Sequence, residues 1–359
     1  MFNKDRFKLA REIRKMSKQE LSNKVRLSVQ TLTEWEKGNT IPKLENLYEL
    51  SKILNFSVDF FNAETNYSII QDTMSFRALT KMKACDRDVT FSYAKLAIDL
   101  AYWIDSKFNL PEGNITFKDN ETPETAANRI RNEWELGECI DDTIFLLEKK
   151  GIKVFSLLDD IEYIDGFSFW NNKTPFVLLT HKKSAEHSRF DAMHELGHLI
   201  LHHNGISRNK NAEKEAHLFA AEILMPKIYV EKYKNITPIL DNFMQLKKRW
   251  KVSLSALIYR FYQLGFISEW SYRTLYIEMR KKGYSQNEPQ SIQWEESIII
   301  NKIFKLLQED NCSIQDISNE TSIPVANLNK LIFNKFSLTV LYGSGNNSSK
   351  SRAKLTLIE

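Results

Sequence analysis

The stretch Asp191-Ala-Met-His-Glu-Leu-Gly-His-Leu-Ile-Leu-His-His203 contains four of the chain's seven histidines, and all seven lie between residues 181 and 217. Histidine is the commonest neutral metal ligand in proteins. On a helix, His194 and His198 share one face about 6 Å apart along the axis, so both imidazoles can bind one metal ion. Glu195 projects about 100° around the helix from His194, where it can reach a water at the metal without being a ligand.

The residues around these histidines predict the helix that carries them. Ser188 and Asp191 form a Ser-x-x-Asp pattern typical of a helix start, and Asn204-Gly205 is a helix-stop signal. An apolar surface is supplied by Met193, Leu196, Leu199, Ile200 and Leu201. Gly197 costs about 1 kcal/mol relative to alanine inside a helix, which is acceptable where another element packs closely against it.

His194, Glu195 and His198 form the His-Glu-x-x-His arrangement of zinc peptidases. A catalytic zinc ion usually takes three protein ligands and a water. His202 lies eight residues beyond His194, about 12 Å along the helix axis, so one ion cannot join the two. The third ligand must therefore come from another element. The next predicted helix, at about 211–224, offers Glu213, Glu215, His217 and Glu222.

Composition is that of a globular protein with two or three domains. The 359 residues are 42% hydrophobic and 27% charged, and the net charge is +4. No apolar run approaches the roughly 20 residues of a membrane span, and no secretory signal opens the chain. The three cysteines are too scattered for a disulfide framework or a cysteine zinc site. We therefore expect a cytoplasmic protein with free thiols and no membrane partner.

The first 60 residues hold 12 Lys/Arg and 8 Asp/Glu, which accounts for the whole net charge. Four or five short helices are predicted there. Ser17 followed by Glu20 starts one of them, and another runs from Ser28 to just before Gly38. The short link between these two helices is typical of a helix-turn-helix, in which the helix from Ser28 would enter the major groove of DNA.

This region resembles the XRE (Cro/C1-type) DNA-binding family. The matching segments are Ser17-Lys-Gln-Glu-Leu-Ser22, Leu27-Ser-Val-Gln-Thr-Leu-Thr-Glu-Trp-Glu-Lys-Gly38, Pro42 and Leu50-Ser-Lys-Ile-Leu-Asn-Phe-Ser-Val-Asp-Phe-Phe61. The resemblance implies groove-facing side chains at Lys18, Gln30, Thr31, Thr33 and Glu34. It also implies an internal salt bridge between Arg11 and Glu36, double-stranded DNA as a partner, and a homodimer on paired half-sites. Arg26 departs from the family, in which many members carry glycine. The alternative is a helical interaction module that no longer binds DNA.

Residues 63–180 mix helices with strands. Strands are predicted at Lys153–Leu157, Gly166–Trp170 and Pro175–Thr180, and the last two could form a hairpin beside the histidine helix. Phe176–Leu179 is the candidate edge strand for binding an extended substrate, with an ordinary structural hairpin as the alternative. Beyond residue 290, Ser313–Leu331 favours a helical hairpin over a second helix-turn-helix. Gly343–Arg352 is flexible by composition.

The two helices of the histidine region resemble the ImmA/IrrE family of metallopeptidases. The matching text is Arg189-Phe-Asp-Ala-Met-His-Glu-Leu-Gly-His-Leu-Ile-Leu-His202 and Glu213-Lys-Glu-Ala-His-Leu-Phe-Ala-Ala-Glu-Ile-Leu-Met-Pro226. The family implies a zincin-like fold, Zn²⁺ as cofactor and Glu195 as the catalytic base. Aligned on Phe219-Ala220, it makes Glu213 the third zinc ligand beside His194 and His198, with Glu215 as second choice. His217 then occupies a position that is usually Asp or Asn and that normally orients a zinc-binding histidine.

Together these observations predict a mainly α protein with a small β-sheet. The expected parts are an all-α helix-turn-helix domain (1–64), an α+β zincin-like metallopeptidase domain (65–285), a C-terminal helical region (286–341) and a flexible tail (342–359). The predicted function is a DNA-binding transcriptional regulator with a zinc-dependent endopeptidase. Its substrate would be a regulatory protein such as a repressor or antitoxin, in mobile-element, toxin–antitoxin or stress control. The alternative is a non-proteolytic regulator or antitoxin that uses the zincin fold as a sensor or protein-binding module.

Overall fold

The computed structural model describes residues 1–65, 67, 83–157, 164–203 and 210–333. Its first part is a bundle of five short helices: α1 (Lys4–Ile13), α2 (Lys18–Val25), α3 (Val29–Lys37), α4 (Leu44–Leu54) and α5 (Val58–Asn62). Ser17 forms a capping box with Glu20 at the start of α2. The Ser28 side chain accepts a hydrogen bond from the backbone of Thr31 at the start of α3. Gly38 ends α3 with a left-handed φ of 80°. The predicted helix-turn-helix is therefore present.

The turn between α2 and α3 keeps a left-handed residue even though it contains no glycine. Arg26 occupies the C-cap of α2 with φ 55° and ψ 38°. That conformation costs a residue with a Cβ about 1–2 kcal/mol. Arg26 therefore adopts the left-handed conformation itself, at the position where many family members carry glycine. The expected salt bridge is also present, with Arg11 Nε 2.6 Å from Glu36 Oε1.

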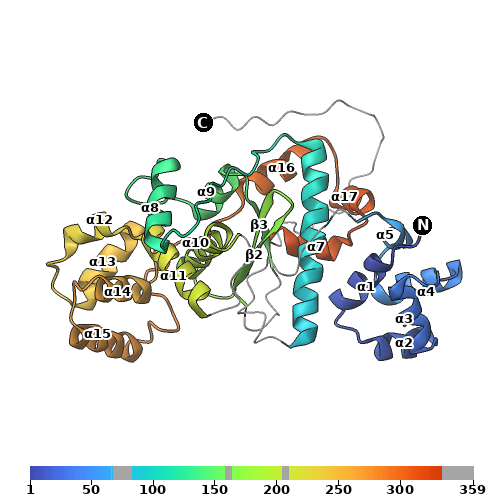
Figure 1. Cartoon of the computed structure of the whole chain (residues 1–359), viewed down its shortest axis with the longest axis horizontal. Helices are drawn as coiled ribbons and strands as arrows, with labels where there is room; N and C mark the ends of the chain where they lie inside the picture. Colours follow the sequence, from blue (N-terminus) through green and yellow to red (C-terminus); the bar gives the residue numbers. More distant parts are fainter. Residues whose placement is uncertain (66, 68–82, 158–163, 204–209, 334–359) are drawn as a thin grey trace.

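A three-stranded sheet lies at the centre of the molecule. Its strands are β1 (Lys153–Ser156), β2 (Gly166–Asn171) and β3 (Thr174–Leu179), in the spatial order β1-β3-β2. β1 runs parallel to β3, and β2 pairs antiparallel with β3 across the two-residue turn Asn172-Lys173. One face shares a hydrophobic core with α7 (Ala84–Lys107), and the other face shares a core with α10 (Ala185–Leu201) (Figure 1).

The prediction that Phe176–Leu179 forms an edge strand is wrong. These residues belong to β3, which has β1 on one side and β2 on the other. Residue periodicity and composition correctly predict that these residues form a strand. They do not reveal that β1 pairs in parallel with β3 and so makes β3 the central strand. The edge strand that contacts α10 is β2.

Helices surround the α10 side of the sheet and extend away from it (Figure 1). Before the sheet come α8 (Pro123–Glu133) and α9 (Thr143–Lys149). After α10 come α11 (Lys210–Leu224), α12 (Lys227–Val230), the 3₁₀ turn η2 (Glu231–Tyr233), α13 (Leu240–Trp250), α14 (Leu254–Gln263) and α15 (Glu269–Lys281). α10 and α11 form the most extensive helix–helix contact, with α8 packed against α11.

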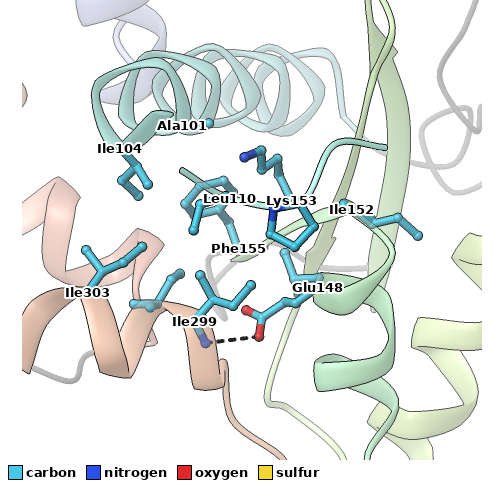
Figure 2. A pocket seen from close by; sticks show the side chains of 13 residues that line it. Ala101, Ile104, Leu110, Glu148, Ile152, Lys153, Phe155, Ile299 and Ile303 are labelled. Carbon is cyan, nitrogen blue, oxygen red and sulfur yellow. Dashed lines mark hydrogen bonds between the residues drawn. The ribbon is translucent and has the colours of Figure 1, made fainter. Parts of the chain in front are cut away.

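The C-terminal helices are α16 (Ile298–Glu309), α17 (Ile314–Thr321) and α18 (Val325–Leu331). α17 and α18 contact each other across residues 322–324. Ser322 ends α17 in a left-handed conformation, as Arg26 ends α2, so the choice of a helical hairpin over a second helix-turn-helix stays a prediction. Figure 2 shows one contact that holds α16: Glu148 of α9 accepts a hydrogen bond from the Ile299 backbone at 3.2 Å. The Ser297 hydroxyl also donates to Glu148. Burial raises the pKa of Glu148 to about 7. The adjoining cavity of about 30 Å³ lies between α7, β1 and α16 and has room for roughly one water.

The helix-turn-helix bundle is docked on α7 through its first helix. Arg6 forms an ion pair with Asp99 of α7, and both side chains are less than a tenth exposed. A few residues along, the Ser92 hydroxyl donates to Glu12 Oε2 at 3.0 Å. Buried apolar side chains of the bundle, of α7 and of α16–α18 form one continuous core. The bundle therefore shares its core with α7, one face of the sheet and the C-terminal helices.

α17 and α18 also contact the bundle and α7. Asn327 donates to the hydroxyl of Tyr93 at 2.9 Å and accepts from Arg14 at 3.5 Å. Glu320 pairs with Lys107 at 2.6 Å. Through these contacts, α17 and α18 link α7 to the end of α1.

The mainly α fold with a small sheet is confirmed. Among the described residues, no helix is both long and apolar enough to cross a membrane. The expected helix stop at Asn204-Gly205 and the glycine- and serine-rich segment at 343–352 lie outside the described residues. The three predicted domain boundaries stay predictions.

Candidate metal centre

α10 begins earlier than the sequence pattern suggests. Its N-cap is Ser184, whose side chain accepts a hydrogen bond from the backbone of His187 at 3.3 Å. Ser188, predicted to start the helix with Asp191, lies inside it and donates its backbone N–H to Ser184 O at 3.1 Å. The predicted start is therefore wrong by one turn. Two serines four residues apart both fit the cap, and the earlier one is used.

The structure brings His194, His198 and Glu213 together. The Nε2 atoms of the two histidines lie 3.1 Å apart. Glu213 of α11 places one oxygen 3.6 Å from His194 Nε2 and the other 3.6 Å from His198 Nε2. Two nitrogen or oxygen ligands of a tetrahedral zinc ion lie about 3.3 Å apart, given bond lengths of about 2.0–2.1 Å. These three donors therefore fit a zinc ion, with one position left for water.

Close packing of α10 on α11 creates this convergence. A Cβ on Gly197 would lie 3.1 Å from the Phe219 ring and 3.2 Å from Ala216 Cα. A side chain at this position would require its neighbours on α11 to shift by a few tenths of an ångström, so glycine lets the two helices pack at this distance. The approach brings Glu213, one turn before Ala216, within reach of the histidines.

Glu195 is buried beside the histidines but turned toward the sheet. Its Oε2 accepts a hydrogen bond from the Ser168 hydroxyl of β2 at 2.7 Å. Burial raises the pKa of Glu195 to about 7, partly offset by His194 and Ser168. Ser168 was missed by sequence reasoning. The alternation Phe167-Ser168-Phe169 places it on the strand face opposite the two phenylalanines, which is the signal that could have found it.

The neighbouring carboxylate Glu215 has a different partner from Glu213. Its Oε2 lies 2.9 Å from His202 Nε2, and His202 Nδ1 lies 3.0 Å from His198 Nδ1. Of the two carboxylates weighed as third ligand, Glu213 therefore faces both candidate ligand histidines, and Glu215 lies behind His198.

His217 contacts aromatic rings. Its ring centroid is 4.8 Å from that of Phe190 and 6.2 Å from that of Tyr259. Burial lowers the pKa of His217, with His194 and His187 adding to the effect. The imidazole therefore favours its neutral form at the edge of the metal centre.

The remaining histidines lie away from the three donors. His203 stacks on Phe117 with ring centroids 4.2 Å apart, and His181 packs edge-on against Trp294. His187 lies 3.4 Å from Lys183 Nζ.

The five DNA-contact candidates lie on α2 and α3. They differ in whether their side chains already form hydrogen bonds or ion pairs within the bundle. Gln30 is exposed. Lys18 pairs with Glu36 at 2.9 Å, and Glu34 accepts from Asn39 at 2.7 Å. The two threonines are held locally: Thr31 bonds Ser28, and Thr33 donates to Val29 O. Gln30 is therefore the candidate whose side chain is most available to a base edge.

Comparisons with known proteins agree with both halves of this description. Residues 7–61 match the helix-turn-helix family model, and residues 147–262 match that of the IrrE N-terminal-like domain, a peptidase M78 family. No curated protein matches the chain. Among solved structures, the chain is similar to the apo form of the competence regulator ComR from Streptococcus vestibularis, with 13% sequence identity. The match covers 86% of this chain and 98% of that one. Its TM-score of 0.16 supports no structural argument. The chain therefore joins an XRE-type helix-turn-helix domain to an IrrE/ImmA-like domain of the M78 peptidase family.

Proposed function

We propose that this regulator binds operator DNA through α3 and uses a zinc centre to cleave a specific regulatory protein. The observation that carries the proposal is the convergence of His194, His198 and Glu213 beside the buried carboxylate of Glu195. A general base and three neutral or anionic ligands with one open position are what zinc-dependent peptide hydrolysis requires.

Each residue of the centre has a role in this chemistry. Zinc, when bound, polarises the scissile carbonyl and lowers the pKa of a coordinated water. Glu195 accepts the proton of the attacking water and passes it to the leaving amine. A pKa near 7 suits a carboxylate that must both accept and release a proton. Ser168 holds Glu195 through its Oε2, which leaves Oε1 for the water.

The substrate would bind as an extended segment along β2. β2 is an edge strand and contacts α10, so one row of its backbone groups points away from the sheet beside Glu195. In the described part of the chain, no strand pairs with that edge. A peptide added there would run past the three ligands in an extended form, which is the form a peptidase cleaves. The substrate class we propose is a repressor, antitoxin or similar regulatory protein.

Metal content tests the centre. We expect the purified chain to retain about one zinc ion and His194→Ala to lose it, because two protein ligands are one fewer than a catalytic zinc site uses. The matched control is His203→Ala, which removes a histidine two residues beyond the end of the same helix but none of the three donors. Zinc is measured by mass spectrometry after gel filtration. Equal zinc in the wild type and His194→Ala would refute the site.

DNA binding tests the other half. Gln30→Ala is expected to weaken binding to a selected operator by about 1–3 kcal/mol, since glutamine reads adenine with two hydrogen bonds. Operators are first selected from genomic fragments, and affinity is measured by fluorescence anisotropy at fixed salt. Gln308→Ala, an exposed glutamine on α16, is the control. Unchanged affinity in Gln30→Ala would remove α3 from base readout. We also propose a homodimer, because regulators of this type read paired half-sites.

The rival function is a zinc-containing regulator or antitoxin that binds a partner without cutting it. His217 favours this rival. It stands at the position where an Asp or Asn side chain usually orients a ligand histidine, but its ring packs on Phe190 and Tyr259. Zinc binding together with an intact partner protein after prolonged incubation would support it. Proteolysis of any protein encoded beside this gene would exclude it.

A further inference from the structure

We infer that His202 and Glu215 form a hydrogen-bond relay that orients His198 for metal binding. The inference rests on the proposed zinc site and deepens it. His198 directs Nε2 toward His194 and Glu213, and its other ring nitrogen, Nδ1, lies 3.0 Å from His202 Nδ1. His202 Nε2 then lies 2.9 Å from Glu215 Oε2. The three side chains form one line from the metal centre to the surface of α11.

Only one proton arrangement satisfies every contact in this line with neutral imidazoles. A metal-binding His198 offers the lone pair of Nε2, so its proton is on Nδ1. That N–H points at His202 Nδ1, which must therefore be the acceptor. The proton of His202 is then on Nε2, where it is donated to the Glu215 carboxylate. Zinc at His198 and the carboxylate of Glu215 thus favour the same pair of tautomers, with the proton of His198 on Nδ1 and that of His202 on Nε2.

The burial of the three groups sets where the relay acts most strongly. The side chains of His198 and His202 are 7% and 12% exposed, whereas Glu215 is 45% exposed. The contact between the two imidazoles is therefore shielded from water, and the outer contact is partly screened. We expect loss of the His202 side chain to lower zinc affinity more than loss of the Glu215 charge.

The relay also explains three features of the sequence. His202 is too far along α10 to be a ligand beside His194, yet one turn after His198 it is well placed to support that residue. Glu213 and Glu215 lie two residues apart on α11. Glu213 lies beside His198 Nε2, whereas Glu215 contacts His202. His217, at the position that usually orients a ligand histidine, contacts Phe190 and Tyr259. In this chain the orienting role passes to His202 and Glu215.

Zinc affinity tests the relay without reference to hydrolysis. Partners that orient a ligand histidine typically account for 10–100-fold in metal affinity. We expect His202→Ala to bind zinc about 10–100-fold more weakly than the wild type, measured by competition with a chromophoric chelator. His202→Asn should recover most of the affinity, because its Oδ1 lies near the position of the histidine Nδ1 and can accept the same proton. A purely structural role for His202 does not predict that rescue.

Two further variants keep the test decisive. Glu215→Gln changes a half-exposed side chain, so it should fold normally and weaken zinc by only a few-fold. His203→Ala, at the next position, should bind like the wild type. Equal zinc affinity in the wild type, His202→Ala and Glu215→Gln would overturn the relay and leave the zinc site standing. A wild type that binds no zinc would overturn both.

Discussion

Glu195→Gln is expected to keep zinc and lose peptide hydrolysis. The carboxylate is a neighbour of the three ligands and not one of them, so the amide should leave the metal site intact. An amide cannot accept the proton of the attacking water. A positioned general base contributes about 10²–10⁴-fold to such reactions, and we expect the cleavage rate to fall by that factor. The measurement is the rate at which purified chain cleaves a protein encoded beside its gene, together with zinc content.

Ser168→Ala is the graded control for this prediction. It removes the 2.7 Å hydrogen bond that holds Glu195 but keeps the carboxylate itself. We expect a loss of about tenfold in rate, because the base is present and less well oriented. If Glu195→Gln cleaves as fast as the wild type, another group is the base. If Glu195→Gln instead loses its zinc, Glu195 takes part in binding the metal.

Local sequence patterns were sufficient to predict the two histidines of the site that lie on α10. The four-residue spacing of His194 and His198 depends only on helix geometry. The same geometry predicts that His202 is not a ligand, and the three donors that the structure brings together do not include it. Glu213 needed the family resemblance, since spacing alone left Glu215 and His217 open. The structure brings Glu213 to both histidines.

The features that sequence reasoning missed depend on contacts between distant segments. Strand order made β3 central and β2 the edge, although both had been identified as strands. Ser168 reaches Glu195 across 27 positions, and Glu215 reaches His202 from the next helix. Docking of α1 on α7 joins residues 93 positions apart, as in Arg6 and Asp99. No periodic pattern encodes such pairs, because each depends on how whole elements pack.

Asp99→Ala is expected to destabilise the docking of the helix-turn-helix bundle by about 3–5 kcal/mol, because it leaves the Arg6 guanidinium buried without its counter-ion. The two side chains are 3% and 6% exposed, so water cannot replace the lost partner. Arg6 keeps a bond to Glu64 O at 2.5 Å, which satisfies one donor but neutralises no charge. Urea unfolding gives the free energy, and hydrogen exchange along α1 and α7 shows where protection is lost.

Two controls separate the buried charge from simple loss of a contact. Lys8→Ala removes the pair between Lys8 and Glu12, which is 3.7 Å long with a half-exposed lysine, and should cost less than about 1 kcal/mol. The double variant Arg6→Met/Asp99→Leu replaces both charges with apolar groups and should recover most of the loss. Burial raises the pKa of Asp99 despite Arg6, so the carboxylate is costly to bury even when paired. A double variant no more stable than Asp99→Ala would mean that α1 and α7 depend on the ion pair itself, and not only on avoiding a lone buried charge.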